Sequence, residues 1–287
     1  MKIRETRVDA DMGLTPEEYF KQDFPSFPEE AFLSTGRPVF DMEKLKNHIH
    51  FLRENPPARP LIKITLPFLS MYPKDLGVLF LPEKGMKYSI GADVAEGLEG
   101  GDASHAKVLD SNMRECAFFH SHLDPDHFGN VLVELAKIYN NAIIVPEINS
   151  MGNTTLEAIK KSGYSRVYMR EVRDEIDQKK LMLKMGLRTD VRSKQVMLNA
   201  LIAAYRDAEV RILDIDTLRE MIRVARGENG MVELNGKDRV VALCLAIQGL
   251  GQLFEKATVY DPNKKERVFY ETKDTSRDRI LKMEKGR

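Results

Sequence analysis

Apolar residues recur along this chain in short runs, and their spacing predicts an alternation of strands and helices. Two strand runs around a short turn are expected at 77–90. Runs at 88–94, about 104–110 and about 114–120 have the length of strands joined by hairpins. This order predicts an α/β fold in which a mixed sheet has helices packed against it. The later pattern predicts a helix at about 125–140, a strand at 142–146, a helix at 154–162, a short strand at 166–170, and helices at about 193–206, 216–226 and 237–254.

Prolines interrupt the first part of the chain, which contains few long periodic segments. Helix starts are indicated at Thr15, where a cap residue precedes a proline, and at Asp41. Residues 1–60 are therefore expected to be an extended arm or linker that lies on a surface. Residues 61–255 are expected to form the main domain, and residues 256–287 a charged tail.

The chain carries no net charge, because its 44 Lys and Arg residues balance 44 Asp and Glu residues. No global field therefore marks it as a nucleic-acid-binding protein, and a DNA surface would require local segregation of charge. Basic residues are densest from Lys160 to Lys194. A solvated face with ion pairs within its helices is the alternative explanation of that stretch.

Cys116 and Cys244 each lie inside an apolar run. They are expected to be small buried hydrophobic residues rather than a disulfide or a metal-binding pair. Met1 leads directly into a charged segment, and no apolar stretch has the length of a membrane span. These features predict a soluble, cytoplasmic protein with no membrane partner.

Three acidic residues stand where apolar segments begin or end: Asp93, Glu147 and Asp238. Asp102 follows a Gly-Gly pair shortly after the first of them. Carboxylates gathered at one edge of a sheet repel one another unless a cation neutralises them, and Mg²⁺ and Mn²⁺ prefer such oxygen ligands. In-line phosphodiester cleavage uses two such ions roughly 3.5–4 Å apart. The pattern therefore predicts an Mg²⁺ or Mn²⁺ site for phosphodiester chemistry, and our hypothesis for this site is that Asp93 bridges two ions whose shells Glu147 and Asp238 complete.

Each of these acids also has a plainer explanation. Asp93 and Asp102 could be turn residues beside glycines. Glu147 could be an exposed acid at a strand end, and Asp238 could favour the positive end of a helix dipole. The position of all of them at strand or helix ends favours the joint interpretation.

A second metal-like pattern follows the strand expected at about 114–120. His120, His122, Asp124 and His127 are similar to the zinc-binding cluster of metallo-β-lactamase-like hydrolases. The last ligand is displaced by two residues from the usual spacing, and none of the six histidines follows His127. A loop leading into a helix, with acids and a proline at the helix start, explains the segment better.

The segments around the three acids resemble the nuclease motifs of phage terminase large subunits. The first motif is matched by Tyr88-Ser-Ile-Gly-Ala-Asp93-Val-Ala-Glu-Gly97 with Gly101-Asp102-Ala-Ser104, and the second by Tyr139-Asn-Asn-Ala-Ile-Ile-Val-Pro-Glu147-Ile-Asn149-Ser-Met-Gly152. The last motif is matched by Asp238-Arg-Val-Val-Ala242. A short element before the late helices is matched by Gly186-Leu-Arg-Thr189 with Ser193-Lys194, and the segment that joins the packaging ATPase to the nuclease by residues 25–41. The resemblance runs from about residue 20 to about residue 255.

This resemblance implies an RNase H-like nuclease that cuts concatemeric double-stranded DNA during phage genome packaging. It implies a packaging ATPase, a small terminase subunit and a portal as further partners, and the host cytoplasm as the location. Carried over by position, Asp93, Glu147 and Asp238 would be the catalytic, metal-binding acids, with Asp102 as an accessory ligand.

The chain departs from the family pattern in three ways. Lys237 stands where the last motif usually has the first of two adjacent acids, and Leu187 replaces a usual aromatic residue. No Gly-x-x-x-x-Gly-Lys-Ser/Thr phosphate loop occurs. The chain is therefore expected not to hydrolyse ATP, and to be a nuclease fragment or a separately encoded half.

Lys180, Arg188, Arg192 and Lys194 are expected to contact the DNA backbone beside the metal site. Lys194 has the strongest case because it matches a lysine of the family element. It is expected either to contact the scissile strand or to hold an acid of the cluster. Two other functions stay open: a resolvase or transposase-like nuclease of the same fold, and a non-catalytic DNA-binding or docking module of a packaging motor.

Overall fold

The computed structural model describes residues 37–60, 65–97, 101–149, 151–173, 181–227, 230–232, 234, 236–254, 258–260 and 267–269. The helix expected near Thr15, Lys180 and most of the predicted charged tail lie outside the described residues.

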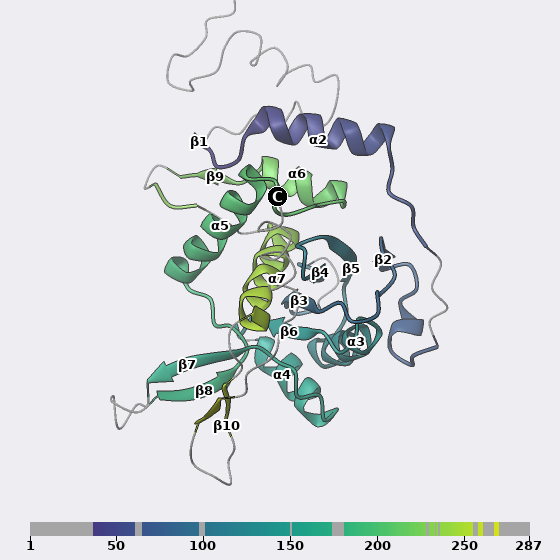
Figure 1. Cartoon of the computed structure of the whole chain (residues 1–287), viewed down its shortest axis with the longest axis vertical. Coiled ribbons are helices and arrows are strands. Elements are labelled where there is room, and N and C mark those ends of the chain that lie inside the picture. The colour runs from purple at the N-terminus through teal and green to yellow at the C-terminus, as the bar shows by residue number, and fades with distance from the viewer. Residues whose placement is uncertain are drawn as a thin grey trace, which may run out of the picture.

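A five-stranded mixed sheet forms the centre of the described fold, in the order β2-β5-β4-β3-β6 (Figure 1). β2, β5, β4 and β3 pair antiparallel, whereas β6 runs parallel to β3. A parallel neighbour requires a crossover connection, which the chain makes through a helix. The predicted α/β fold with a mixed sheet is therefore confirmed. The strands are β2 (Leu76–Val78), β3 (Tyr88–Asp93), β4 (Ser104–Asp110), β5 (Glu115–Ser121) and β6 (Ile143–Pro146).

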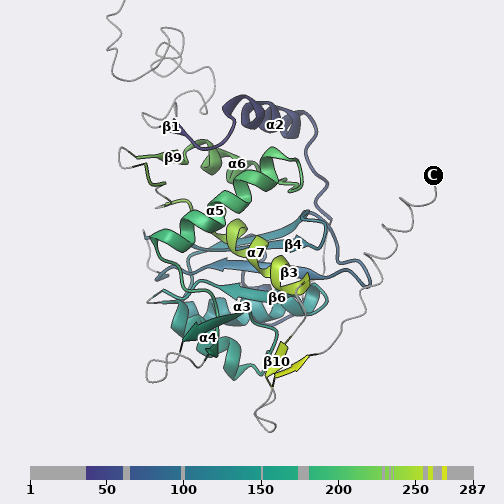
Figure 2. The same cartoon turned by 60° about the vertical axis from the view of Figure 1, so that its left-hand side comes forward.

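Helices cover both faces of this sheet (Figure 2). α3 and α4 lie on one face, and α7 lies across the other; α5 and α6 pack on α7, and α2 packs on α6. No helix in the described part of the chain has both the length and the apolar composition to cross a membrane. The helices are α2 (Met42–Glu54), the short 3-10 helix η2 (Leu69–Met71), α3 (Pro125–Ile138), α4 (Gly152–Lys161), α5 (Val191–Arg206), α6 (Ile215–Ile222) and α7 (Asp238–Phe254).

Alternation along β3 assigns its side chains to the two faces. Ile90 and Ala92 are fully buried in the apolar cluster that α3 and α4 complete. Ser89 and Gly91 point the other way, towards α7. The strand is therefore covered on both sides, which explains why all of its residues except Asp93 are buried.

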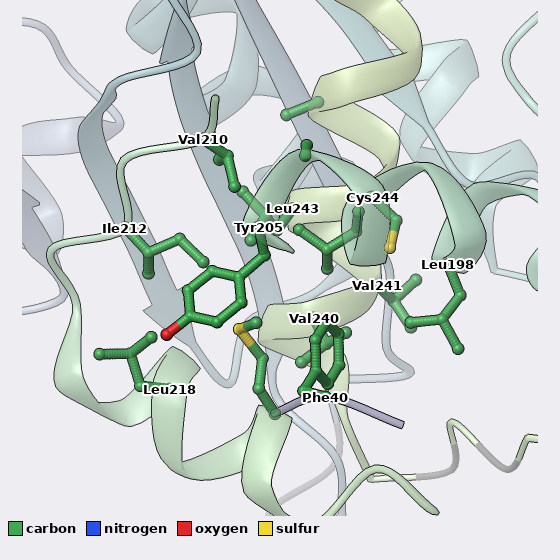
Figure 3. Close-up of a cluster of buried hydrophobic side chains, with 14 of the residues drawn as sticks. Phe40, Leu198, Tyr205, Val210, Ile212, Leu218, Val240, Val241, Leu243 and Cys244 are labelled. Atoms are coloured by element: carbon green, nitrogen blue, oxygen red, sulfur yellow. The ribbon is translucent and has the colours of Figure 1, made fainter. Parts of the chain in front are cut away.

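A second apolar cluster fills the space between α7 and the outer helices (Figure 3). Tyr205 of α5 meets Phe40 edge to face, with ring centroids 6.1 Å apart. Val241 and Cys244 of α7 are buried in the same cluster. Cys244 and Cys116 are both buried and free, which confirms the prediction that neither forms a disulfide.

Part of the predicted arm belongs to this second cluster. Asp41 caps α2 by accepting a hydrogen bond from the Lys44 backbone N–H at 3.0 Å, as its sequence predicted. Leu45, Ile49 and Leu52 are then buried against the cluster. A two-residue strand, β1 (Arg37–Pro38), pairs with β9 (Ala225–Arg226). The division of the chain at residue 60 stays a prediction.

The segment after α4 differs from the expectation. The strand predicted at 166–170 is observed as β7 (Met169–Arg173), which pairs with β8 (Leu181–Met185) in a separate antiparallel hairpin. Val167, just before β7, bridges Ile144 of the central sheet. β8 escaped prediction because its leucine, methionine and lysine residues favour helices and include no β-branched side chain. A second small hairpin joins β10 (Thr258–Tyr260) and β11 (Arg267–Phe269).

Gly91 allows α7 to lie directly on β3. A Cβ atom at this position would stand 2.0 Å from the backbone oxygen of Ala242 and 2.3 Å from the backbone nitrogen of Ala246. Backbone atoms of a packed helix cannot rotate away as a side chain can. The glycine therefore fixes how closely α7, and with it Asp238 at its start, approaches the sheet.

We expect Gly91→Ala to lower the free energy of unfolding by at least about 2 kcal/mol, because the added methyl group overpacks a helix–sheet contact. Gly251→Ala is the matched control. Gly251 lies in α7, the helix that packs on Gly91, and a Cβ atom there meets nothing within 4 Å. That change should raise the free energy of unfolding by up to about 1 kcal/mol. Urea unfolding of both variants measures the difference, and equal stabilities would contradict this account of the contact.

Candidate active site

The parallel pairing of β3 and β6 brings the first two predicted acids together. Asp93 is the last residue of β3, and Glu147 follows the last residue of β6. The Glu147 backbone N–H donates to the Ala92 carbonyl oxygen at 2.9 Å, so the two strand ends stay in register. The carboxyl groups of Asp93 and Glu147 are hydrogen-bonded to each other.

Asp238 reaches the same end of the sheet from α7, as the helix's first residue. Its carboxylate lies close enough to interact electrostatically with Asp93 and with Glu147. Asp102 is exposed at the rim and interacts with Asp238. The structure thus brings the predicted acids to one place, although they are up to 145 residues apart in the sequence, from Asp93 to Asp238.

The electrostatics of the acid cluster reflect burial first and the crowding of like charges second. Burial raises the pKa of Asp93 well above its ordinary value, and the hydrogen-bonded Glu147 and nearby Asp238 add to the effect. Burial and the Asp102 carboxylate also raise the pKa of Asp238, against the opposing charges of Arg239 and Lys237. These effects favour the protonated form of Asp93.

The pKa of Glu147 shifts in the opposite direction from that of Asp93. Burial favours its neutral form, but hydrogen bonds with Asp93 and Thr189 and the charge of Lys194 together lower its pKa. The Thr189 hydroxyl donates to Glu147 Oε1, and Lys194 Nζ lies 3.3 Å from the same oxygen. Thr189 belongs to the short element quoted from the sequence, but no pattern there indicated that its hydroxyl would bind Glu147.

The segment that carries Thr189 is held along β6 by backbone hydrogen bonds. Leu187 N–H donates to the Pro146 oxygen at 3.0 Å, and Ile148 N–H donates to the Leu187 oxygen at 2.8 Å. Gly186 adopts a φ of 78°, which favours glycine, where the chain turns out of β8. These contacts place the residues after Leu187 beside Glu147.

The residue after Thr189 is Asp190, the N-cap of α5, and this cap places Lys194. Asp190 and Ser193 form a capping box, with 2.7 Å hydrogen bonds in both directions. Lys194 then lies in the first turn of α5 and points towards Glu147. Of the two predicted roles for Lys194, the structure displays the contact with an acid of the cluster.

Asn149 ties the loops that follow the two acidic strand ends. Its side-chain N–H₂ donates to the Val94 oxygen at 3.1 Å, and its side-chain oxygen accepts from the Gly152 N–H at 2.8 Å. A Cβ atom on Gly152 would stand 1.9 Å from the backbone carbonyl oxygen of Glu147, so this turn requires glycine. Asn149 therefore helps to fix Glu147 relative to Asp93.

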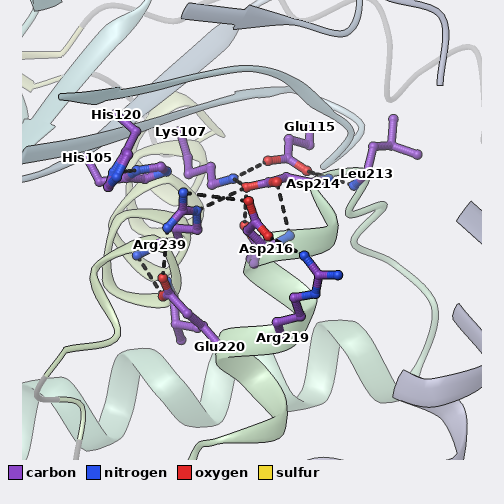
Figure 4. Close-up of polar contacts among 12 residues, drawn as sticks. His105, Lys107, Glu115, His120, Leu213, Asp214, Asp216, Arg219, Glu220 and Arg239 are labelled. Atoms are coloured by element: carbon purple, nitrogen blue, oxygen red, sulfur yellow. Dashed lines mark hydrogen bonds and ion pairs between the residues drawn. The ribbon is translucent and has the colours of Figure 1, made fainter. Parts of the chain in front are cut away.

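The histidines of the zinc-like sequence pattern contact other groups. His105 Nδ1 of β4 and His120 Nδ1 of β5 lie 3.1 Å apart (Figure 4). His122 Nε2 donates to the Gly101 backbone oxygen at 2.9 Å. His127 meets Phe68 edge to face. Among the residues that the structure describes, no group of three or more His, Cys, Asp or Glu side chains stands ready to hold a metal ion. Among the described residues, neither these histidines nor the acid cluster therefore forms a ready-made coordination shell for a metal ion.

Two of the predicted DNA-contacting residues lie close in sequence to Thr189, which binds Glu147. Arg188 and Arg192 are exposed on either side of Thr189 and the start of α5. Arg170 of β7 is close enough to Arg188 for their charges to interact, and burial together with Arg188 lowers the pKa of Arg170. Lys180 lies outside the described residues. The DNA-binding role of these residues stays a prediction.

Comparison with known proteins gives structural neighbours only. No family model and no curated protein matches the chain. The large terminase nuclease from thermophilic phage G20c is 17% identical, matches 74% of this chain and 98% of its own, and has a TM-score of 0.50. The same nuclease with bound magnesium is 17% identical over 66% of this chain and 98% of its own, with a TM-score of 0.48. The Thermus phage P74-26 large terminase nuclease domain is 18% identical over 65% of this chain and 90% of its own, with a TM-score of 0.47. The resemblance expected from the sequence is thus confirmed in the fold, an RNase H-like mixed sheet flanked by helices that this chain shares with phage large terminase nucleases.

Proposed function

We propose that this protein is a divalent-metal-dependent endonuclease that cleaves concatemeric double-stranded DNA during phage genome packaging. The observation that carries the proposal is the convergence of Asp93, Glu147 and Asp238 at one end of the sheet. This convergence occurs in a fold shared with a phage terminase nuclease.

The chemistry of the acid cluster fits Mg²⁺ or Mn²⁺. Every predicted ligand is a carboxylate oxygen, the donor that these hard cations prefer. Asp93 and Glu147 lie close enough to be hydrogen-bonded, which two ionised carboxylates cannot be without a shared proton or a cation. A bound cation would replace the shared proton and remove the repulsion, so metal binding should release a proton.

A pair of Mg²⁺ or Mn²⁺ ions would supply the activation of water and the stabilisation of the departing 3′-oxygen. Asp93, Glu147 and Asp238 would hold them, with Asp102 at the rim. Thr189 fixes the orientation of Glu147 through its hydroxyl group. Lys194 contributes a positive charge within 3.3 Å of Glu147, which limits the repulsion of an approaching phosphate.

Arg188, Arg192 and Lys180 would bind the phosphate backbone of the duplex beside this cluster, together with Lys194. Such contacts position a duplex without reading its sequence. Function in packaging would further require a packaging ATPase, a small terminase subunit and a portal, in the host cytoplasm.

Incubation with supercoiled plasmid tests the function. We expect nicked and linear products in Mn²⁺ or Mg²⁺ and none with a chelator. Cleavage that continues in chelator would contradict the metal dependence. Preferential cutting of four-way junctions would favour a resolvase-like enzyme of the same fold. Duplex binding without cleavage in Mn²⁺ would favour a docking module, an alternative that Lys237 at a usually acidic position keeps open.

A further inference from the structure

The residue at the N-cap position of the helix that carries Asp238 cannot cap the helix with its side chain. α7 begins at Asp238, and Lys237 occupies the N-cap position, since its carbonyl oxygen accepts from the Val241 N–H at 2.9 Å. An N-cap side chain normally accepts a hydrogen bond from the second or third residue of the helix. A lysine ammonium has donors only, so Lys237 cannot do this.

Glu220 of α6 supplies the missing cap from another helix. Its Oε2 accepts from the Arg239 N–H at 2.9 Å and from the Val240 N–H at 3.2 Å. These are the second and third residues of α7, the two positions that an N-cap side chain serves. Glu220 is 5% exposed, so the hydrogen bonds are sheltered from water. Asp238 is the residue that immediately precedes the capped pair.

Arg239 connects this cap to the rest of the fold (Figure 4). Its Nη1 lies 3.2 Å from Glu220 Oε1, and its Nε lies 3.5 Å from Asp214 Oδ2. The same Asp214 oxygen accepts from Lys107 Nζ of β4 at 2.7 Å. The first turn of α7 is thereby tied to α6 and, through two buried charges, to the central sheet.

We propose that Glu220 and Arg239 are positioning residues for the acid cluster. They fix the first turn of α7, and with it the direction in which Asp238 presents its carboxylate to Asp93 and Glu147. The proposal rests on the proposed function, because it assigns these residues a part in assembling the metal site. Neither residue needs to touch the ions or the DNA.

A role in stability alone would not require so many charges. Buried ion pairs are often replaced by well-packed apolar residues without loss of stability. The arrangement here is directional. The Glu220 carboxylate accepts hydrogen bonds from two neighbouring backbone N–H groups, and the Arg239 guanidinium forms an ion pair with the same carboxylate. Such bonds set an orientation more strictly than apolar contacts do.

The test compares Glu220→Ala with Glu157→Ala. Glu157 is an exposed helix residue in a 2.7 Å ion pair with Lys160, and it is remote from α7 in the sequence. Mn²⁺ binding is measured by titration calorimetry, well below the unfolding temperature, and amide hydrogen exchange is measured for residues 239–241. We expect Glu220→Ala to weaken Mn²⁺ binding about tenfold and to expose these amides selectively. Glu157→Ala should match the unchanged protein in both measurements.

Glu220→Gln is a second variant that tests the proposal if Glu220→Ala does not fold. It keeps one acceptor oxygen for the N–H groups but loses the charge that Arg239 grips, so its Mn²⁺ affinity should fall between those of the unchanged protein and Glu220→Ala. The Mn²⁺ affinity of Arg239→Lys should also fall between those of the unchanged protein and Glu220→Ala, because lysine keeps the positive charge but lacks the several N–H donors of the guanidinium group.

Unchanged Mn²⁺ affinity in folded Glu220→Ala would overturn the proposal, and so would absence of Mn²⁺ binding by the unchanged protein. The proposal would also be overturned if Mn²⁺ binding by Glu220→Ala weakens only in proportion to the fraction of the variant that is unfolded, because that result shows a structural role only. If the unchanged protein binds Mn²⁺ but does not cut DNA, the proposed function fails. The positioning role is then still decided by the binding measurements.

Discussion

Asp93→Asn is expected to abolish metal-dependent DNA cleavage while leaving the fold intact. We expect the nicking rate to fall at least about a thousandfold, which corresponds to about 4 kcal/mol of lost transition-state stabilisation. Asp93 interacts with both Glu147 and Asp238, so the proposed function makes its carboxylate the one that both candidate ions would share. The asparagine amide keeps a donor for the Glu147 carboxylate, so the hydrogen bond that the aspartate makes can persist.

Asp207→Asn is the matched control for this substitution. Asp207 is exposed at the end of α5, where it pairs with Arg206 at 2.8 Å, far from the acid cluster along the helix. Removing its charge should leave nicking unchanged. Circular dichroism and urea unfolding establish that Asp93→Asn is folded. Near-normal nicking by folded Asp93→Asn in Mn²⁺ would contradict the assignment.

Lys107→Met is expected to cause the largest loss of stability, about 3 kcal/mol or more, because it leaves buried carboxylates without their cation. Lys107 is fully buried, and its Nζ lies 2.6 Å from Glu115 Oε1 and 2.7 Å from Asp214 Oδ2. Methionine fills a similar volume but cannot donate a hydrogen bond. Lys160→Met removes a lysine from an equally short but exposed pair, and it should change stability by less than about 0.5 kcal/mol. Urea unfolding compares the two, and equal losses would contradict this account.

The stabilisation from Lys107 should depend on pH. Burial favours the neutral form of Asp214, but Lys107 and then Arg239 hold its pKa at about 2, below the ordinary 3.8. Because the pKa is lowered in the folded state, the stabilisation is present above about pH 4 and is lost as the pH falls towards 2. It amounts to on the order of 2 kcal/mol at neutral pH. The stability gap between the unchanged protein and Lys107→Met should therefore narrow over that acid range.

The sheet and the acids at its ends were predictable because local patterns specify them. The apolar runs around Ile90 and Ile144 are long enough to identify β3 and β6, and the acids stand where those runs end. Parallel pairing of the two strands then follows from the intervening helix α3. The helix starting at Asp238 was predictable from the apolar residues that follow it.

The supporting contacts were not predictable, because their partners are far apart in the sequence. Lys107 binds carboxylates 8 and 107 residues away, and Glu220 caps a helix whose amides are 19 and 20 residues away. Thr189 reaches Glu147 only because β8 ends beside β6. Each of these contacts depends on the packing of elements, and packing leaves no periodic signal in the sequence.

The most direct test of the central claim is a crystal structure of this protein soaked in Mn²⁺, with anomalous diffraction recorded to locate the ions. We expect anomalous density between the carboxylates of Asp93, Glu147 and Asp238, with two ions in this cluster. Mn²⁺ bound elsewhere with this cluster empty, or carboxylates that point to separate faces of the molecule, would contradict it.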